Sequence, residues 1–226
     1  MSFYNDYRPT KFAEVLGQGQ SLQILKRQAE TGNFHHSYLF YGHSGSGKTS
    51  TARILAMAVN CVVMNGTGEP CGECQSCKGI RSGSHWDVLE VDGARFSRVE
   101  DARELAYKAQ FVPFGGGKKV YILDECHRLS EAAWDSLLRL VEEPPPHLVL
   151  ILCTTEPAKI PTTIKSRCQL YPFHALKPDD VKSKLGVIAG REGITLDPRH
   201  LQFIVESAAG NMRSAENLLE QVLCLK

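Results

Sequence analysis

One glycine-rich segment has the residue types and spacing that bind phosphate groups. The run Gly42-His43-Ser44-Gly45-Ser46-Gly47-Lys48-Thr49 matches the pattern GxxxxGK[ST], in which backbone amides turn inward around phosphate oxygens. A strand-like run precedes it and a helical pattern at residues 50–59 comes after it, as the motif requires; a chance glycine-rich turn is the alternative. We expect Lys48 to pair with the β- and γ-phosphates, and the phosphate-binding residues to be Gly42, Ser44, Gly45, Ser46, Gly47, Lys48, Thr49 and Ser50.

Two adjacent carboxylates follow the apolar run at residues 120–123. Asp124 and Glu125 have the pattern of acidic groups that a strand delivers to the phosphate end of a nucleotide site. We expect Asp124 and Thr49 to hold Mg²⁺, and Glu125 to polarise water for hydrolysis of ATP. A helix-capping acidic pair is the alternative interpretation. Asp124-Glu125-Cys126-His127 also matches the DExH pattern of helicases, which resemble two tandem domains of this kind, whereas this chain has room for one.

Four cysteines lie close together after the phosphate-binding segment. Cys61, Cys71, Cys74 and Cys77 read CxxxxxxxxxCxxCxxC, and closely spaced thiolates in a reducing compartment suit a structural, tetrahedral Zn²⁺ site. A redox CxxC pair and an iron–sulfur cluster are the alternatives. We expect a zinc module at about residues 61–77, outside the nucleotide-binding core. We interpret the remaining cysteines as core residues: Cys126, Cys153, Cys168 and Cys224.

Composition and charge restrict the class of protein. The chain has 226 residues, with 26 Lys and Arg against 25 Asp and Glu, so a net charge of +1 will not by itself recruit nucleic acid or an anionic membrane. Any contact with DNA must therefore be local. The sequence has no apolar run of the roughly 20 residues that a membrane span needs, and its start lacks the pattern of a signal peptide. We expect a cytoplasmic protein that does not bind membranes.

The elements that must position these residues alternate along the chain. Strand-like runs at residues 37–41, 85–91, 120–123 and 148–153 are separated by helical patterns, which predicts an α/β fold with a parallel sheet flanked by helices. The two most apolar runs, 120–123 and 148–153, should be central strands. Helix starts are indicated by Ser97 with Glu100, by Ser130, and by Asp197 before Pro198.

The last part of the chain has a different pattern. Prolines interrupt regular structure after residues 148–153, and the remaining sequence shows three helical patterns, at 178–189, 198–207 and 212–226, with no strand signal. We expect a nucleotide-binding domain at 1–176 and a small helical domain at 177–226. The last pattern reaches Lys226 without a closing residue, so we expect the natural chain to continue.

These motifs together carry a resemblance to a known family. The chain resembles, almost end to end, the gamma/tau ATPase family of the bacterial DNA polymerase III clamp loader, within the AAA+ superfamily. Besides the phosphate-binding, acidic and cysteine motifs, the resemblance is carried by Tyr7-Arg8-Pro9, Val15-Leu16-Gly17-Gln18, Glu142-Glu143-Pro144-Pro145, Thr154-Thr155-Glu156-Pro157-Ala158-Lys159-Ile160-Pro161, Ser166-Arg167-Cys168-Gln169 and Gly210-Asn211-Met212-Arg213.

The resemblance assigns roles that residue types alone leave open. By type, Thr155 could position water at a strand end, Arg167 is a rim charge, and Arg213 is a cation at a helix start. The resemblance implies that Thr155 is sensor 1, Arg213 is sensor 2 in a lid domain, and Arg167 is an arginine finger for a neighbouring subunit's ATP. It also implies an adenine pocket lined by Arg8, Pro9, Val15, Gly17 and Gln18.

The resemblance also implies an activity and partners. ATP binding would organise an arc of subunits (delta, delta prime and further gamma/tau copies) that opens a sliding clamp on primer-template DNA, and hydrolysis would release both. The DNA would be held through its phosphates by groups such as Ser97 and Arg98, for which simple helix capping is the alternative. The helical collar that continues the chain in this family is absent from these residues.

Other functions remain as alternatives. A replication-factor-C-like subunit and a branch-migration motor are disfavoured by the cysteine insertion. A delta-prime-like stator that does not hydrolyse ATP is disfavoured by the intact Lys48, Thr49, Asp124 and Glu125.

Overall fold

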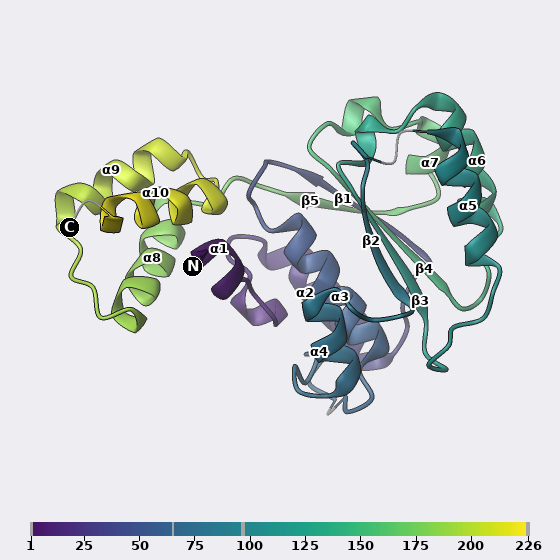
Figure 1. Cartoon of the computed structure of the whole chain (residues 1–226), viewed down its shortest axis with the longest axis horizontal. Coiled ribbons are helices and arrows are strands. Elements are labelled where there is room, and N and C mark those ends of the chain that lie inside the picture. Colours follow the sequence, from purple (N-terminus) through teal and green to yellow (C-terminus); the bar gives the residue numbers. More distant parts are fainter. Residues whose placement is uncertain (1, 65, 96–97, 225–226) are drawn as a thin grey trace.

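The computed structural model describes residues 2–64, 66–95 and 98–224 (Figure 1). Its centre is a five-stranded parallel sheet in the order β2-β3-β4-β1-β5. The strands are β1 (Ser37–Gly42), β2 (Val88–Asp92), β3 (Lys119–Asp124), β4 (Leu148–Thr154) and β5 (Gln169–Phe173). The predicted α/β class and parallel sheet are therefore confirmed.

Helices cover both faces of this sheet (Figure 1). On one face lie α2 (Gly19–Thr31), α3 (Lys48–Asn60) and α4 (Gln75–Ser82), and on the other lie α5 (Val99–Ala109), α6 (Glu131–Glu142) and α7 (Thr162–Lys165). Successive side chains of a strand point to opposite faces, so Phe40, Ile122 and Ile151 enter the first core while Leu123 and Leu152 enter the second. Both layers bury apolar surface, which is the main favourable contribution to folding.

The prediction of two central strands is confirmed. β4 is buried at every residue, and β3 is buried at its four middle residues. Strands covered on both faces need continuous apolar runs, which explains why these two were the clearest in the sequence. β2 lies at the sheet edge and begins at Val88, three residues later than expected.

The expectation that no strand follows β4 is wrong, because β5 pairs with β1. Pro172 lies inside β5, opposite Tyr41, and proline normally argues against a strand because it has no N–H to donate. β5 is the edge strand next to β1, where only one side of the strand needs ladder hydrogen bonds. The edge position thus accommodates Pro172, the residue that argued against a strand in the sequence.

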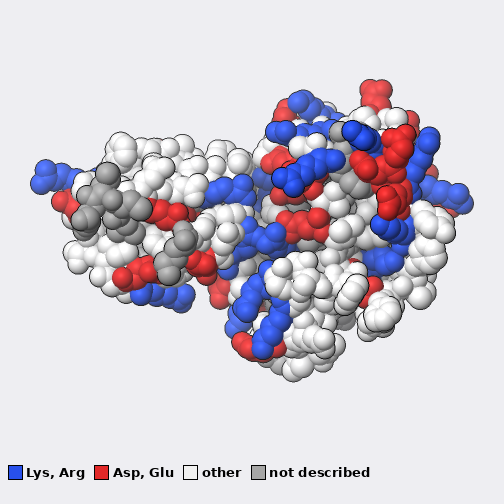
Figure 2. Space-filling view, viewed as in Figure 1, with Lys and Arg blue, Asp and Glu red and all other residues white. Residues whose placement is uncertain are grey.

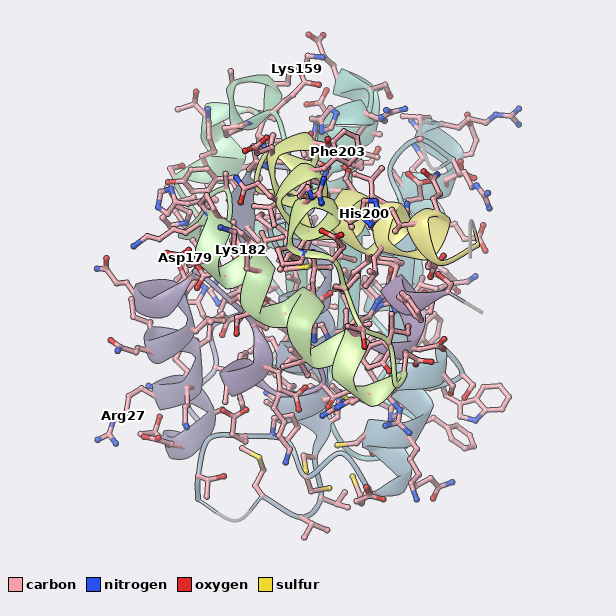
Figure 3. All side chains as sticks on the ribbon, turned by 90° about the vertical axis from the view of Figure 1, so that its left-hand side faces the viewer. Arg27, Lys159, Asp179, Lys182, His200 and Phe203 are labelled. Atoms are coloured by element: carbon pink, nitrogen blue, oxygen red, sulfur yellow. The ribbon has the colours of Figure 1, made fainter. Side chains whose placement is uncertain are left out.

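Three helices follow the sheet, as predicted: α8 (Pro178–Arg191), α9 (Pro198–Ala208) and α10 (Met212–Cys224). They share a core in which Leu185, Ile204 and Leu219 are fully buried. Phe3 of α1 (Phe3–Asp6) inserts into the same core, so the first helix of the chain packs with the last three. Figure 3 looks onto this end and shows polar and apolar side chains on its surface, with Asp179, Lys182, His200 and Phe203 labelled.

Two of the predicted helix caps can be checked. The Ser130 hydroxyl accepts a hydrogen bond of 3.2 Å from the Ala133 amide, and Asp197 caps α9 by accepting one of 2.7 Å from the Arg199 amide. The predicted cap Ser97 lies outside the described residues, and α5 begins at Val99 after Arg98. Three short 3₁₀ turns complete the described elements: Phe12–Glu14, Cys126–Arg128 and Pro157–Lys159.

The burial of the described cysteines outside the cluster agrees with their interpretation as core residues. Cys126 and Cys153 are fully buried, and the partly buried Cys168 packs against the core beneath α5 and α6. The side chain of Cys224 lies outside the described part of the chain. Among the described residues, no helix is both long enough and apolar enough to cross a bilayer.

Candidate functional site

The phosphate-binding segment forms the loop between β1 and α3. Gly42 has a φ of +132°, and a Cβ there would lie 2.0 Å from the Phe173 carbonyl oxygen, so only glycine fits. The Lys48 ammonium is inside the loop, donating to the carbonyl oxygens of Gly42 at 3.0 Å and His43 at 2.8 Å. The loop therefore has the conformation and the charge that a phosphate group requires.

Lys48 is only 5% exposed, and this burial lowers the pKa of its amine. The negative groups nearby, including Glu125 and Asp124, oppose that shift and favour the charged form. The lysine is therefore a buried cation whose nearest partners are carbonyl oxygens. An incoming phosphate would be a stronger partner for it than these neutral groups.

Thr49 and Asp124 come together at the mouth of the loop. The Thr49 hydroxyl donates to Oδ2 of Asp124 at 2.8 Å, and the Glu125 amide donates to Oδ1 at 3.0 Å. Burial raises the pKa of Asp124, while these two hydrogen bonds oppose the shift. A hydroxyl and a carboxylate in contact are hard oxygen donors, so the pair fits Mg²⁺, which prefers one or two carboxylates plus substrate phosphates.

Glu125 adopts the left-handed conformation, with a φ of +47°, which is rare for a residue with a side chain. Its Oε2 accepts a hydrogen bond from the Thr155 hydroxyl at 3.2 Å and lies 3.3 Å from Nδ1 of His127. Nε2 of the same histidine lies 3.1 Å from Glu156. The segment after β4 thus supplies a group that orients the Glu125 carboxylate at the end of β3.

Arg213 reaches the same site from the first turn of α10. The Met212 amide donates to the Gly45 carbonyl oxygen at 3.1 Å, so α10 starts directly on the phosphate-binding loop. The Arg213 guanidinium lies 4.2 Å from the ring centroid of Tyr4 and donates to its hydroxyl. The Arg8 guanidinium lies 4.5 Å from the same centroid, so Tyr4 contacts two arginines.

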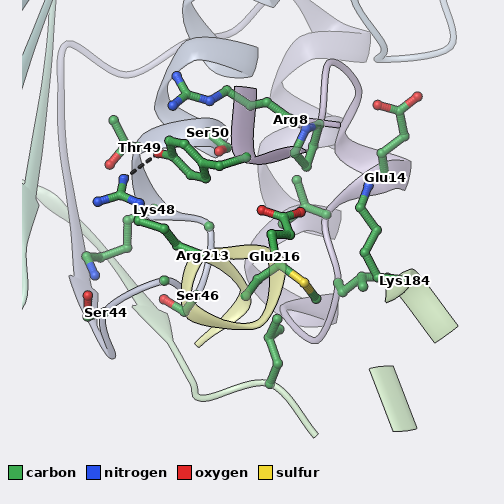
Figure 4. A pocket seen from close by; sticks show the side chains of 18 of the residues that line it. Arg8, Glu14, Ser44, Ser46, Lys48, Thr49, Ser50, Lys184, Arg213 and Glu216 are labelled. Carbon is green, nitrogen blue, oxygen red and sulfur yellow. Dashed lines mark hydrogen bonds between the residues drawn. The ribbon is translucent and has the colours of Figure 1, made fainter. Parts of the chain in front are cut away.

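One cavity connects these residues (Figure 4). It extends from the phosphate-binding loop across Arg213 to the N-terminal segment and α8. The lining residues are Tyr4, Arg8, Pro9, Glu14, Val15, Leu16, Ser44, Gly45, Ser46, Gly47, Lys48, Thr49, Ser50, Asp124, Glu125, Leu176, Lys184, Met212, Arg213 and Glu216.

The residues expected around the adenine divide into two groups. Arg8, Pro9 and Val15 line the cavity, whereas Gly17 and Gln18 do not. The side-chain amide of Gln18 donates hydrogen bonds to the carbonyl oxygens of Ser46 at 3.3 Å and His174 at 2.8 Å. Gln18 thus joins the phosphate-binding loop to the segment after β5.

Arg167 does not line the cavity. Its guanidinium lies 2.8 Å from the Glu142 carboxylate and also donates to the Thr163 carbonyl oxygen at 2.8 Å. Its side chain is 39% exposed, so it is accessible from outside the chain.

Several lining residues were not anticipated from the sequence. Tyr4, Lys184 and Glu216 face the cavity from α1, α8 and α10, and none of the three lies within a motif identified in the sequence. His127 also gained no role from its spacing, although its DExH context was visible. These residues are brought together by tertiary packing, which a linear pattern does not display.

The four cysteines form a compact cluster beside α3 and α4. Their sulfur atoms all lie within 4.8 Å of one another, and those of Cys71 and Cys77 are 3.9 Å apart. Tetrahedral zinc with Zn–S bonds of about 2.3 Å requires sulfur separations of about 3.8 Å, so the cluster fits Zn²⁺. Amide hydrogen bonds from Cys74 and Glu73 lower the pKa of Cys71 to about 6, which favours the thiolate. The cluster packs on the core, since Cys77 is fully buried within it.

The fold has relatives among solved structures. The Holliday junction branch migration motor RuvB of Thermotoga maritima matches with a TM-score of 0.69 at 17% identity, covering 96% of this chain and 65% of that chain. At this identity the likeness establishes the fold alone. The chain therefore shares the α/β fold of this motor, with the glycine-rich loop between β1 and α3.

Sequence relatives give the family. The family model described as DNA polymerase III, delta subunit, matches residues 17–177, and the chain belongs to this family. It is 41% identical over 98% of its length to DNA polymerase III subunit tau of Bacillus subtilis, of which it covers 39%. It is 41% identical over 96% of its length to subunit tau of Escherichia coli K12, of which it covers 34%. It is 40% identical over 99% of its length to subunit gamma/tau of Mycobacterium tuberculosis H37Rv, of which it covers 39%. The chain spans less than half the length of these curated relatives.

Proposed function

We propose that the chain is the ATPase module of a bacterial DNA polymerase III clamp loader of the gamma/tau type. ATP binding would drive the opening of a sliding clamp and its loading onto primer-template DNA, and hydrolysis would release clamp and DNA. The observation that carries the proposal is the single cavity in which Lys48, Thr49, Asp124, Glu125 and Arg213 meet. The identity to tau subunits favours this function over branch migration, for which only the fold speaks.

Binding of ATP would use the present backbone conformation of the loop. The amides of Gly45 and Gly47 and the dipole of α3 would receive the phosphates, and the Lys48 ammonium would exchange its carbonyl partners for the β- and γ-phosphates. Thr49 and Asp124 would hold Mg²⁺, which supplies positive charge to the phosphates when bound. Pro9 and Val15 would contact the adenine on its apolar faces.

Hydrolysis would use the residues at the ends of β3 and β4. Glu125 would accept a hydrogen bond from the attacking water and so orient its oxygen toward the γ-phosphorus. Thr155 would hold the Glu125 carboxylate in place through its hydrogen bond of 3.2 Å. Arg213 would leave the Tyr4 hydroxyl and stabilise the charge that develops on the γ-phosphate.

Arg167 is proposed to act on the ATP of a neighbouring subunit. Its exposure and its position outside its own chain's cavity lining support a role in trans. The neighbours would be delta, delta prime and further gamma/tau copies. Exposed aromatic side chains, including Trp86 at 90% and Phe114 at 91%, supply apolar surface of the kind that protein partners cover.

The remaining assignments concern zinc, DNA and the lid. We propose a structural Zn²⁺ on Cys61, Cys71, Cys74 and Cys77, because four filled thiolate positions leave no site for a substrate. Figure 2 shows positive and negative side chains interspersed on one face, so contacts with DNA phosphates would be local, and we propose Arg98 as one of them. We also retain the division into a domain at 1–176 and a helical lid at 177–226.

The proposal is tested by ATP hydrolysis of the full-length protein assembled with its companion subunits. The rate should rise strongly only when sliding clamp and primed DNA are both present, and Lys48→Ala should abolish it. Stimulation by DNA alone would point to a motor that moves on DNA. Absence of nucleotide binding by the parent protein would point to a stator.

A further inference from the structure

Glu216 is a buried acid that has no role in the proposed hydrolysis of ATP. It lies on α10, one turn after Arg213, and it lines the cavity while being only 4% exposed. No residue that the structure describes donates a hydrogen bond to its carboxyl group or forms a salt bridge with it. The favourable charge with the largest effect on it is that of Lys184 on α8, whose ammonium donates to the Tyr7 carbonyl oxygen at 3.0 Å, and Arg213 acts in the same direction.

A mostly buried carboxyl group without a hydrogen-bond partner is unfavourable, because it loses most of its water and nearby charges only partly compensate. Burial also raises the pKa of Glu216, to about 7, and the neighbouring Glu220 acts in the same direction. Packing does not require an acid at this position, since an apolar side chain of similar size would avoid the cost. The carboxyl group is therefore suited to a partner that enters the cavity.

The position of Glu216 in the cavity indicates which part of a nucleotide it would meet. In Figure 4 the phosphate-binding residues Ser44, Ser46 and Lys48 lie at one end of the cavity, and Glu14 and Lys184 lie at the other. Glu216 points into the space between them. Phosphate groups would repel an ionised carboxyl group and are already served by Lys48, so the nucleoside is the part that Glu216 would face.

We propose that Glu216 is a specificity-determining residue that recognises the nucleoside by accepting a hydrogen bond from one of its donor groups. The donor is either the exocyclic amine of the base or a hydroxyl of the ribose, since both are neutral N–H or O–H groups on the nucleoside. This inference rests on the proposed nucleotide-binding function and adds the selection of the nucleotide to it. Apolar residues that line the same cavity, such as Leu176 and Met212, would contact the nucleoside without distinguishing its donors.

The test is equilibrium binding by the full-length protein, by competition against one fluorescent ATP analogue. The competitors are ATP, purine riboside triphosphate (which lacks the exocyclic amine), 2′-deoxyATP and 3′-deoxyATP. At pH 8, where most of the Glu216 carboxyl groups are ionised, the parent should bind ATP about tenfold more tightly than the analogue that lacks the recognised donor, as expected for a lost hydrogen bond to a buried charged group. The identity of that analogue distinguishes base recognition from ribose recognition.

Glu216→Leu should bind ATP and that analogue within about twofold of each other, because the acceptor is gone. Glu216→Gln, which keeps a carbonyl acceptor and a similar shape, should retain a reduced preference. Equal binding of all four nucleotides by the parent would overturn the inference, and so would an unchanged preference in Glu216→Leu. If the parent binds no nucleotide at all, the proposed function fails as well, and this outcome is distinct from the other two.

Discussion

The Thr49 hydroxyl donates a 2.8 Å hydrogen bond to the Asp124 carboxylate, which joins the first turn of α3 to the end of β3. The two residues are far apart in the sequence, and the parallel sheet places the end of β3 beside the phosphate-binding loop. The contact puts a hydroxyl and a carboxylate where a cation bound to the β- and γ-phosphates would lie. The charge of Asp124 should therefore control how the cation affects nucleotide binding.

Asp124→Asn should remove the Mg²⁺ dependence of ATP binding and leave the protein folded. The amide retains the size of the side chain and can still accept from Thr49, but it loses the negative charge that attracts the cation. We expect the parent to bind ATP more tightly with Mg²⁺ than with EDTA, and the variant to bind equally in both, by calorimetry. An equal gain from Mg²⁺ in both proteins would contradict the assignment.

Glu125→Gln should separate ATP binding from hydrolysis. The amide cannot polarise water as a carboxylate does, so we expect a fall in turnover of about 100-fold or more with ATP affinity nearly unchanged. Thr155→Val removes only the hydroxyl that orients Glu125 and should reduce turnover less. Single-turnover hydrolysis in the assembled complex measures both, and turnover at the parent rate in Glu125→Gln would show that another group activates the water.

Arg167→Ala should reduce ATP hydrolysis by about 10³-fold or more in an assembled complex and leave ATP binding by the separate subunit unchanged. Glu142→Gln is the matched control, because it removes the charge that Arg167 pairs with at 2.8 Å while preserving the arginine. We expect this control to retain hydrolysis. Full activity of an assembled Arg167→Ala complex would exclude a role in trans.

The cysteine cluster should contain about one tightly bound zinc ion per chain, measured by atomic emission on the purified protein. Removing the ion with a strong chelator should lower the thermal unfolding temperature, because closed structural sites stabilise the fold that contains them. Cys74→Ser should lose most of the metal, whereas Cys168→Ser, outside the cluster, should retain it. A metal-free protein of unchanged stability would contradict a structural zinc site.

Stability should fall as pH rises through the titration of Glu216. Burial raises its pKa from 4.5 to about 7 in the folded chain, so the folded state binds the proton more tightly than the unfolded state does. The stabilisation that comes from protonated Glu216 is complete below about pH 4.5 and is lost as pH rises to about 7. The free energy of unfolding changes by about 3 kcal/mol at most over this range.

Urea unfolding at pH 5 and pH 8 measures this contribution by comparing the parent with Glu216→Gln. The amide does not titrate, so the variant should lose less stability between these two pH values than the parent does. The buried Asp124, whose pKa is also raised, affects both proteins equally. Identical pH dependence in the two proteins would show that folding does not raise the pKa of Glu216.

Much of the fold was predictable because the informative residues are neighbours in the sequence. The glycines and Lys48 must be adjacent to form one loop, and the buried strands β3 and β4 require apolar runs that end in functional residues. β5 escaped prediction because Pro172 disfavours a strand unless the strand lies at an edge, and edge position is a property of the assembled sheet.

The rest of the candidate site could not be derived from the sequence for a related reason. Tyr4, Lys184 and Glu216 come from three helices that meet only after α1 packs against α8 and α10. A single lysine or glutamate in a helical pattern usually lies on a solvated face and a tyrosine is commonly half-buried, so residue type alone does not indicate a site. The burial of Glu216 beside a cavity distinguishes it, and burial is a tertiary property.

Clamp loading itself is measured by transfer of a labelled sliding clamp to primed circular DNA by the full-length protein assembled with its companion subunits. We expect the labelled clamp to elute with the DNA when ATP is present, and not to do so when the gamma/tau-type subunit carries Lys48→Ala. Transfer that is equally efficient without ATP, or with Lys48→Ala, would contradict the claim that this site drives clamp loading.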